Sequence, residues 1–254
     1  MKKIIAACVA AAALALACTD VTGSANSVLS IQFDTLASPS VVIGDSLRDS
    51  TGALALPHVR AYNFEGAVVA TPRVRYSAAN RGVTVDSVTG VIRGDSLRAT
   101  PVRIIATVGD IQAQQLLAVT LRPDSMFATA ARDTILYSLL DSTLNLSKAL
   151  TVSLRHGKTG ADSAVATYLV SFSIVSASSA AIADLVDDIG RKSRVDTTDG
   201  GGLAGRRIRL HATAPAFVAN ASDSIILSAT AKYRGAIVKG GPVRLVVVFK
   251  PRNP

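Results

Sequence analysis

The sequence predicts an all-β protein, with two tandem β-sandwich domains after an N-terminal signal peptide. Three observations support this prediction. Short apolar runs alternate with turn residues at the close spacing that is typical of a sandwich. No stretch keeps a helical apolar period over several turns. Glu65 is the only glutamate, and every other acidic residue is an aspartate, which favours turns over helix surfaces.

The N-terminus has the pattern of a secretory signal, which we assign to residues 1–17. Lys2 and Lys3 form a basic start, and the apolar run from Ile4 to Leu16 is too short for an ordinary transmembrane helix. Signal-peptidase cleavage after Ala15 or Ala17 would follow from the small residues there. We therefore expect the protein to leave the cytoplasm.

The four residues Ala15-Leu16-Ala17-Cys18 resemble a bacterial lipobox, which implies that Cys18 carries lipid and becomes the mature N-terminus. A lipid-anchored protein would reside at the outer membrane or cell surface. With ordinary cleavage instead, it would be periplasmic or secreted. Cys8 lies within the signal, so no pair of cysteines remains for a disulfide.

The charge balance is basic. The net charge of +9 falls to +7 when Lys2 and Lys3 leave with the signal, and this favours polyanionic neighbours. Most arginines are scattered, so a diffuse solvated surface is the preferred interpretation. The alternative is a dedicated polyanion site in the two tight basic clusters, which contain Arg191, Lys192, Arg194, Arg206, Arg207 and Arg209.

Aromatic residues are few, and tryptophan is absent. This argues against sites that need stacking platforms for sugars or bases, and we expect no nucleic-acid partner.

The domain organisation follows from composition and from one proline. Residues 18–27 are small and polar, as expected of a tether. Pro123 follows an apolar run and cannot donate to a strand ladder, so we predict one sandwich over 28–122 and a second over 124–250. Candidate strands span 28–33, 40–43, 58–63, 73–77, 82–86, 91–93, 102–108, 112–121, 134–137, 150–155, 167–175, 207–212, 224–233 and 243–249. We expect residues 176–206 to form a long connection without strands, with one or two helical turns over 180–188.

The first half resembles bacterial Ig-like domains of the second group. The motifs that carry the likeness occur in the family's order: Ile43-Gly44-Asp45, Asn63 to Gly66, Tyr76 to Asn80, Asp86 to Ile92, and a closing strand pair ending at Val119-Thr120. Tyr76 stands where the family has tryptophan. In the second half, Val195 to Ala214 resembles the Gly-rich turn and following strand of invasin-like Ig domains. These resemblances imply Ig-like sandwiches throughout.

The segment Val41 to Arg48, "VVIGDSLR", resembles the first block of GDSL esterases, which implies Ser46 as a nucleophile. A serine needs a positioned imidazole to take its proton. None of His58, His156 and His211 follows the family's Asp-x-x-His pattern, no Gly-x-Asn-Asp block is present, and "GDSLR" recurs at 94–98. We therefore interpret Gly44-Asp45-Ser46 as a turn in which Asp45 accepts a backbone bond two residues on, and the histidines as surface or strand-end residues.

Five aspartates lie close together in the second half and suggest calcium: Asp184, Asp187, Asp188, Asp196 and Asp199. Their spacing does not match an EF-hand loop, and Arg191, Lys192 and Arg194 oppose a bound cation. A solvated loop is the preferred interpretation, so we expect no metal and no cofactor.

The function predicted from the sequence is therefore that of a non-catalytic, lipid-anchored structural or adhesion protein of the cell envelope. Its partners would be the membrane, through the anchor, and an envelope polysaccharide or another surface protein. The alternatives are a secreted GDSL-type serine esterase using Ser46, and a polyanion-binding surface module.

Overall fold

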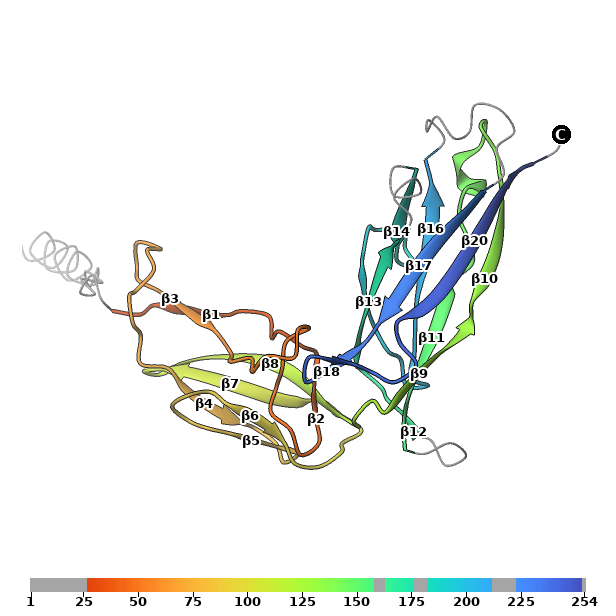
Figure 1. The fold of residues 1–254 in the computed structure, drawn as a ribbon. Coiled ribbons are helices and arrows are strands. Elements are labelled where there is room, and N and C mark those ends of the chain that lie inside the picture. The colour runs from red at the N-terminus through yellow and green to blue at the C-terminus, as the bar shows by residue number, and fades with distance from the viewer. Residues whose placement is uncertain (1–26, 158–162, 176–181, 212–222, 253–254) are drawn as a thin grey trace, which may run out of the picture.

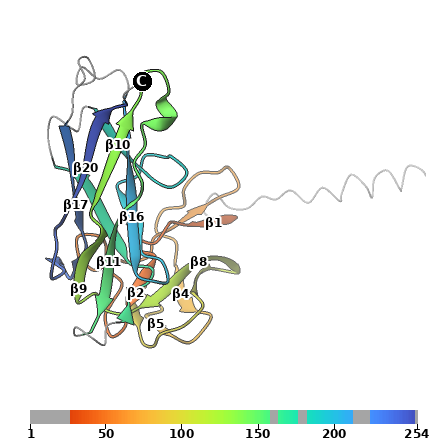
Figure 2. The same ribbon diagram turned by 90° about the vertical axis from the view of Figure 1, so that its right-hand side faces the viewer.

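The computed structural model describes residues 27–157, 163–175, 182–211 and 223–252. Over these residues the protein is all-β, apart from one short 3₁₀ turn at Ser142–Leu144. Two elongated sandwiches meet at an angle, and a four-residue linker, 121–124, joins them (Figure 1). The described chain starts at the far end of the first sandwich and finishes at the far end of the second (Figures 1 and 2). The expected all-β class with tandem sandwiches is confirmed, whereas Cys18 lies outside the described residues.

The first sandwich is built on a four-stranded sheet with the order β2-β8-β7-β4, completed by the pairs β1-β3 and β5-β6. The alternation of apolar and polar residues along these strands decides which side chains face inward. The strands are β1 (Ser30–Phe33), β2 (Ser40–Val42), β3 (Val59–Tyr62), β4 (Arg75–Ala78), β5 (Val83–Val85), β6 (Ile92–Gly94), β7 (Val102–Val108) and β8 (Ile111–Thr120).

The second sandwich has one five-stranded sheet, β10-β20-β17-β13-β15, and a second sheet, β12-β11-β16-β14, which β9 extends by pairing with β11. A small hairpin, β18-β19, projects beside them. The strands are β9 (Ser125–Ala130), β10 (Arg132–Tyr137), β11 (Leu150–His156), β12 (Ser163–Ala164), β13 (Leu169–Ile174), β14 (Ala183–Val186), β15 (Val195–Thr197), β16 (Leu203–Leu210), β17 (Asp223–Thr230), β18 (Lys232–Tyr233), β19 (Ala236–Ile237) and β20 (Val243–Pro251).

Both sandwiches begin with the same topological device. In the first, β1 pairs antiparallel with β3, and the chain then crosses to run parallel to the last strand, β8, as β2. In the second, β9 pairs antiparallel with β11, and β10 then runs parallel to the last strand, β20. The first strand of each unit is thus divided between its two sheets. The two halves of the chain therefore share this arrangement of their first strands, although their sheets differ in size.

Each sandwich has its own hydrophobic core. The first is drawn from residues 33–119 and includes the fully buried Ile92, Ile104 and Leu117. The second is drawn from residues 126–249 and is larger, with Phe172 and Phe249 among its buried side chains. Burying each such side chain contributes about 1.5–3 kcal/mol by removing apolar surface from water.

The long connection expected over 176–206 is wrong in the part that the structure describes, 182–206. That part contains β14 and β15, and no helical turn. β14 pairs antiparallel with β16, and this pairing buries Leu185 and Val186. Pairing with a strand that lies distant in sequence outweighs the weak local helical preference. The strand β9 was not among the expected strands, because the sequence Asp124-Ser125 after Pro123 is typical of a turn.

Candidate functional site

Asp45 lies where the two sandwiches meet. Gly44, with a φ of +73°, turns the chain after β2 and directs the Asp45 side chain into the junction, where the residue is only 4% exposed. Its Oδ2 lies 3.0 Å from Nε of Arg48, in the same loop, and 2.8 Å from Nε of Arg234, which follows β18 in the second sandwich. One carboxylate therefore holds a guanidinium from each domain.

The turn expected at Gly44-Asp45-Ser46 is confirmed, but Asp45 acts differently from the expectation. Its Oδ1 accepts a hydrogen bond from the N–H of the next residue, Ser46, at 2.8 Å. This bond replaces the expected one from the backbone N–H two residues on. Burial opposes ionisation of Asp45, yet the hydrogen bonds from Arg234, Arg48 and the Ser46 N–H outweigh it. They hold the pKa of this carboxyl well below its usual range.

The second sandwich supplies two tyrosines to the junction. The guanidinium carbon of Arg234 lies 5.5 Å from the ring centroid of Tyr233, a cation–π geometry that orients the arginine toward Asp45. Tyr168 donates its hydroxyl to the carbonyl of Lys232 at 2.6 Å, and burial raises the pKa of its phenol above the usual range. These contacts fix the segment after β17 within the second sandwich, from which Arg234 reaches Asp45.

Two further hydrogen bonds cross the junction. Ser40 in β2 donates its hydroxyl to the Thr167 carbonyl at 2.5 Å, and Thr120 at the end of β8 donates to the Ala166 carbonyl at 2.6 Å. Both donors are buried. The junction is therefore polar and specific in its partners, because each bond satisfies a group that burial would otherwise leave without water.

A cavity of about 340 Å³ opens between the domains at this junction. Cavities at domain interfaces are common positions for ligand sites. Hydroxyl groups, two tyrosines and five charged side chains form its wall, with Ser38, Ser40, Ser46, Thr51, Ser171, Thr230, Tyr168, Tyr233, Asp45, Arg48, Asp49, Lys232 and Arg234 among the lining residues.

Sequence reasoning had missed Tyr168, Lys232, Tyr233 and Arg234. Arg234 has a φ of +50°, which is uncommon for a residue with a side chain. No local pattern in the sequence marks this conformation or pairs Arg234 with the first domain.

Ser46 lines the cavity, but none of the three histidines does. Each histidine instead contacts an aspartate: His58 with Asp34 at 2.7 Å, His156 with Asp124 at 2.8 Å and His211 with Asp184 at 3.0 Å. His58 directly precedes β3, His156 ends β11 and His211 follows β16, so their expected strand-end positions are confirmed. The structure brings no imidazole to Ser46 within the described part of the chain.

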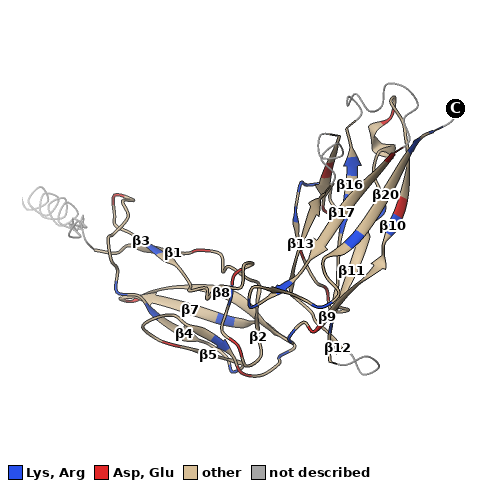
Figure 3. Ribbon diagram, in the orientation of Figure 1, with Lys and Arg blue, Asp and Glu red and all other residues tan. Residues whose placement is uncertain are grey.

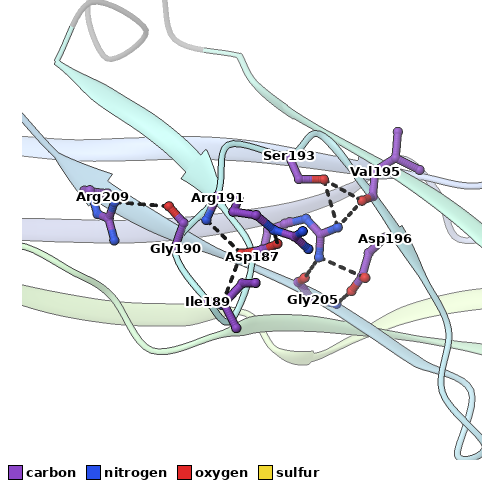
Figure 4. A network of polar contacts seen from close by, with 10 residues as sticks. Asp187, Ile189, Gly190, Arg191, Ser193, Val195, Asp196, Gly205 and Arg209 are labelled. Carbon is purple, nitrogen blue, oxygen red and sulfur yellow. Dashed lines mark hydrogen bonds and ion pairs between the residues drawn. The ribbon is translucent and has the colours of Figure 1, made fainter.

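The basic clusters of the second sandwich divide between core and surface. Along β16, Ala204, Arg206, Ile208 and Leu210 face inward, and Arg206 is only 7% exposed. Its Nη1 lies 2.9 Å from Oδ1 of Asp196 in the opposite sheet, and its Nη2 donates to Ser193 and to the Val195 carbonyl (Figure 4). Arg206 therefore links the two sheets of the second sandwich from the inside and is not presented to a polyanion.

The other basic residues of these clusters face solvent or lie near the surface, and several have local partners. Arg191 pairs with Asp187 at 2.9 Å, and Arg209 donates to the Gly190 carbonyl at 3.1 Å (Figure 4). Lys192 pairs with Asp184 at 2.7 Å. Arg194 is exposed and Arg207 is half-buried. Lysines and arginines are spread over both sandwiches (Figure 3).

The aspartates considered for calcium serve other roles. Asp187 and Asp199 each accept two backbone N–H groups of their own turns. Asp184 and Asp196 pair with basic side chains, and Asp188 lies in the β14–β15 connection. Across the residues that the structure describes, no three His, Cys, Asp or Glu side chains group as metal ligands. In the same residues, no helix is long and apolar enough to span a membrane.

Comparisons with known proteins give remote similarities. No protein-family model matches the chain, and no curated protein matches it. Domains 1–6 of the surface layer protein SbsC align at 10% identity and a TM-score of 0.32, over 89% of this chain and 28% of that one. Domains 4 and 5 of that protein align at 11% identity and a TM-score of 0.31, over 88% of this chain and 97% of that one.

The EC1-2 fragment of human protocadherin-24 aligns at 15% identity and a TM-score of 0.27, over 90% of this chain and 100% of that one. The chain thus spans less than a third of the SbsC fragment with domains 1–6. Similarities at this level record a likeness and carry no argument about activity or partners.

Proposed function

We propose that this protein is an exported, non-catalytic module of the bacterial cell envelope, with two Ig-like sandwiches held at a lipid-anchored position through Cys18. The observation that carries the proposal is the junction around Asp45. A buried carboxylate that binds Arg48 and Arg234 joins the sandwiches into one unit, as a structural or adhesion module requires. Rigid sheets then present strand edges and end loops to partners.

Two further observations support this function over the esterase alternative. Ser46 lies at the junction without an imidazole among the residues lining the cavity, so the base that activates a GDSL-type serine is missing there. The topological repeat supports a modular protein, because both units use the same division of the first strand between two sheets. A chain of this kind acts by holding and presenting surfaces.

The polyanion alternative has weaker support. Arg206 is buried, and Arg191 and Lys192 already pair with aspartates, so the two clusters do not form one free basic surface. A diffuse basic surface remains and would attract anionic lipid or polysaccharide in a manner that salt screens.

Metabolic labelling with a palmitate analogue, followed by membrane fractionation and antibody staining of intact cells, tests the proposal. Wild-type protein should be labelled, fractionate with membranes and be stained. Cys18→Ala should lose the label and leave the membrane fraction. Cys8→Ala is the matched control and should stay labelled, because Cys8 belongs to the predicted signal. An unlabelled wild-type protein in the cytoplasm would overturn the proposal.

A further inference from the structure

The cavity at the domain junction has a wall that is unusually rich in hydroxyl groups. Ser40 and Ser46 come from the first sandwich, and Ser171 and Thr230 come from the second. Ser171 and Thr230 are direct cross-strand partners on β13 and β17, so their side chains stand next to each other on one face. A hydroxyl both donates and accepts hydrogen bonds, which matches ligands that carry several hydroxyls themselves.

Two aromatic residues line the cavity, and both are tyrosines. Tyr168 and Tyr233, two of the chain's five tyrosines, line the wall, although the chain has no tryptophan. The ring of Tyr233 is already engaged by Arg234, whereas Tyr168 is half-buried, packs in part against the core of the second sandwich and also lines the cavity. An aromatic ring with a polar tip offers an apolar face for C–H groups beside a hydrogen-bonding edge.

The charges of the wall leave one cation without an anionic partner. Asp45 forms ion pairs with both Arg48 and Arg234, and Asp49 is occupied by the Thr51 hydroxyl and by backbone N–H groups of its own turn. Lys232 is exposed at the rim, and among the described residues no carboxylate forms an ion pair with it. A ligand with one negative charge would complete this arrangement.

We infer that this cavity binds an acidic sugar residue, such as the uronic acid of a glycan. Its carboxylate would pair with Lys232, its hydroxyls would bond to Ser171 and Thr230, and one face of its ring would lie against Tyr168. A volume of about 340 Å³ accommodates a single sugar unit. The inference goes beyond the proposed envelope function, since it concerns a ligand of the purified protein and does not depend on Cys18.

Calorimetric titration and saturation-transfer NMR of the purified full-length protein test it with three probes: glucuronate, glucose and acetate. Glucuronate should bind, with a dissociation constant on the order of 1 mM for a single sugar. Glucose should bind more weakly because it lacks the carboxylate, and acetate should bind more weakly because it lacks the hydroxyls. Lys232→Ala should reduce the affinity for glucuronate about tenfold and leave that for glucose unchanged.

Two variants separate the parts of the site. The double variant Ser171→Ala/Thr230→Val should weaken glucuronate and glucose alike. Lys250→Ala, which removes an exposed lysine of β20 outside the cavity, is the matched control and should bind as wild type. Melting curves establish that each variant folds. The inference is overturned if no probe binds, if Lys250→Ala weakens binding as much as Lys232→Ala, or if acetate binds as well as glucuronate.

Discussion

Gly52 of the first sandwich packs backbone to backbone against Gly235 of the second. A methyl group on Gly52 would overlap the backbone N of Gly235 and lie 2.6 Å from its Cα. Gly52 has a φ of +94° and Gly235 a φ of +82°, so both also use a conformation that favours glycine. The contact lies beside the Asp45–Arg234 bond, because Arg48 donates to the Gly52 carbonyl at 2.9 Å. Two segments far apart in sequence therefore meet without side chains between them.

Gly52→Ala should separate the two sandwiches. The added methyl group meets backbone, which cannot move aside without shifting the β18–β19 hairpin. Small-angle X-ray scattering should report a larger radius of gyration and a broader distribution of domain angles. Gly66→Ala is the matched control, since Gly66 has a φ of +77° and open space around its Cβ position. Both substitutions cost about 1–2 kcal/mol in backbone strain, but only Gly52→Ala should change the scattering. Equal profiles would show that the contact does not hold the domains.

Asp45→Asn should destabilise the protein by about 1–3 kcal/mol at neutral pH, because it weakens the charge-assisted hydrogen bonds from Arg48 and Arg234 at a buried position. The folded-state pKa of Asp45 is lowered, so its contribution is fully present above the unfolded-state value and is lost as the pH falls through the folded-state value. The difference from wild type in chemical denaturation should therefore persist at pH 5 and shrink below about pH 4.

The control for this pH dependence is Asp110→Asn, in the exposed turn between β7 and β8, which changes the net charge by the same amount. It should alter stability by less than about 0.5 kcal/mol at every pH. A difference between Asp45→Asn and wild type that stays constant from pH 7 to about pH 2 would contradict an ionised Asp45 in the junction.

Arg206→Ala should destabilise the second sandwich by about 2–3 kcal/mol, since it leaves Asp196 without its cation and removes a buried side chain between the sheets. Arg209→Ala, three residues along the same strand, removes an exposed side chain with one bond to a backbone carbonyl. Its effect should stay within about 0.5 kcal/mol. Urea denaturation measures both, and similar losses would argue against the inward position of Arg206.

Ser46→Ala should not change the rate at which the protein hydrolyses short acyl esters. The serine has no imidazole nearby in the described structure, so wild type and Ser46→Ala should both show only the uncatalysed background rate. Chromogenic ester assays across pH 6–9 measure this. A rate that exceeds the buffer background in wild type and disappears in Ser46→Ala would establish the esterase alternative instead.

Much of the strand pattern follows from neighbouring residues alone. The span Val102–Val108 was expected with the same bounds as β7, and Val74 and Tyr76 lie on the more buried face opposite Arg73 and Arg75, as their alternation predicts. A period of two depends only on local geometry, so it can be read from the chain. Short polar-flanked strands such as β9 and β14 were missed, because their strand state depends on pairing partners.

The amino-acid order was also sufficient to decide that Ser46 lacks the partner residues of a GDSL esterase, since that test needs only the residues around each histidine. The role of Asp45 needed the folded chain. The residues Gly44-Asp45-Ser46 predict a turn, and the structure has a turn there. The partner of Asp45 in the second sandwich, Arg234, lies 189 residues away in the sequence. Burial and pairing between domains arise only when the two sandwiches pack against each other. The alternation of apolar and polar residues within each sandwich does not determine which residues then come into contact.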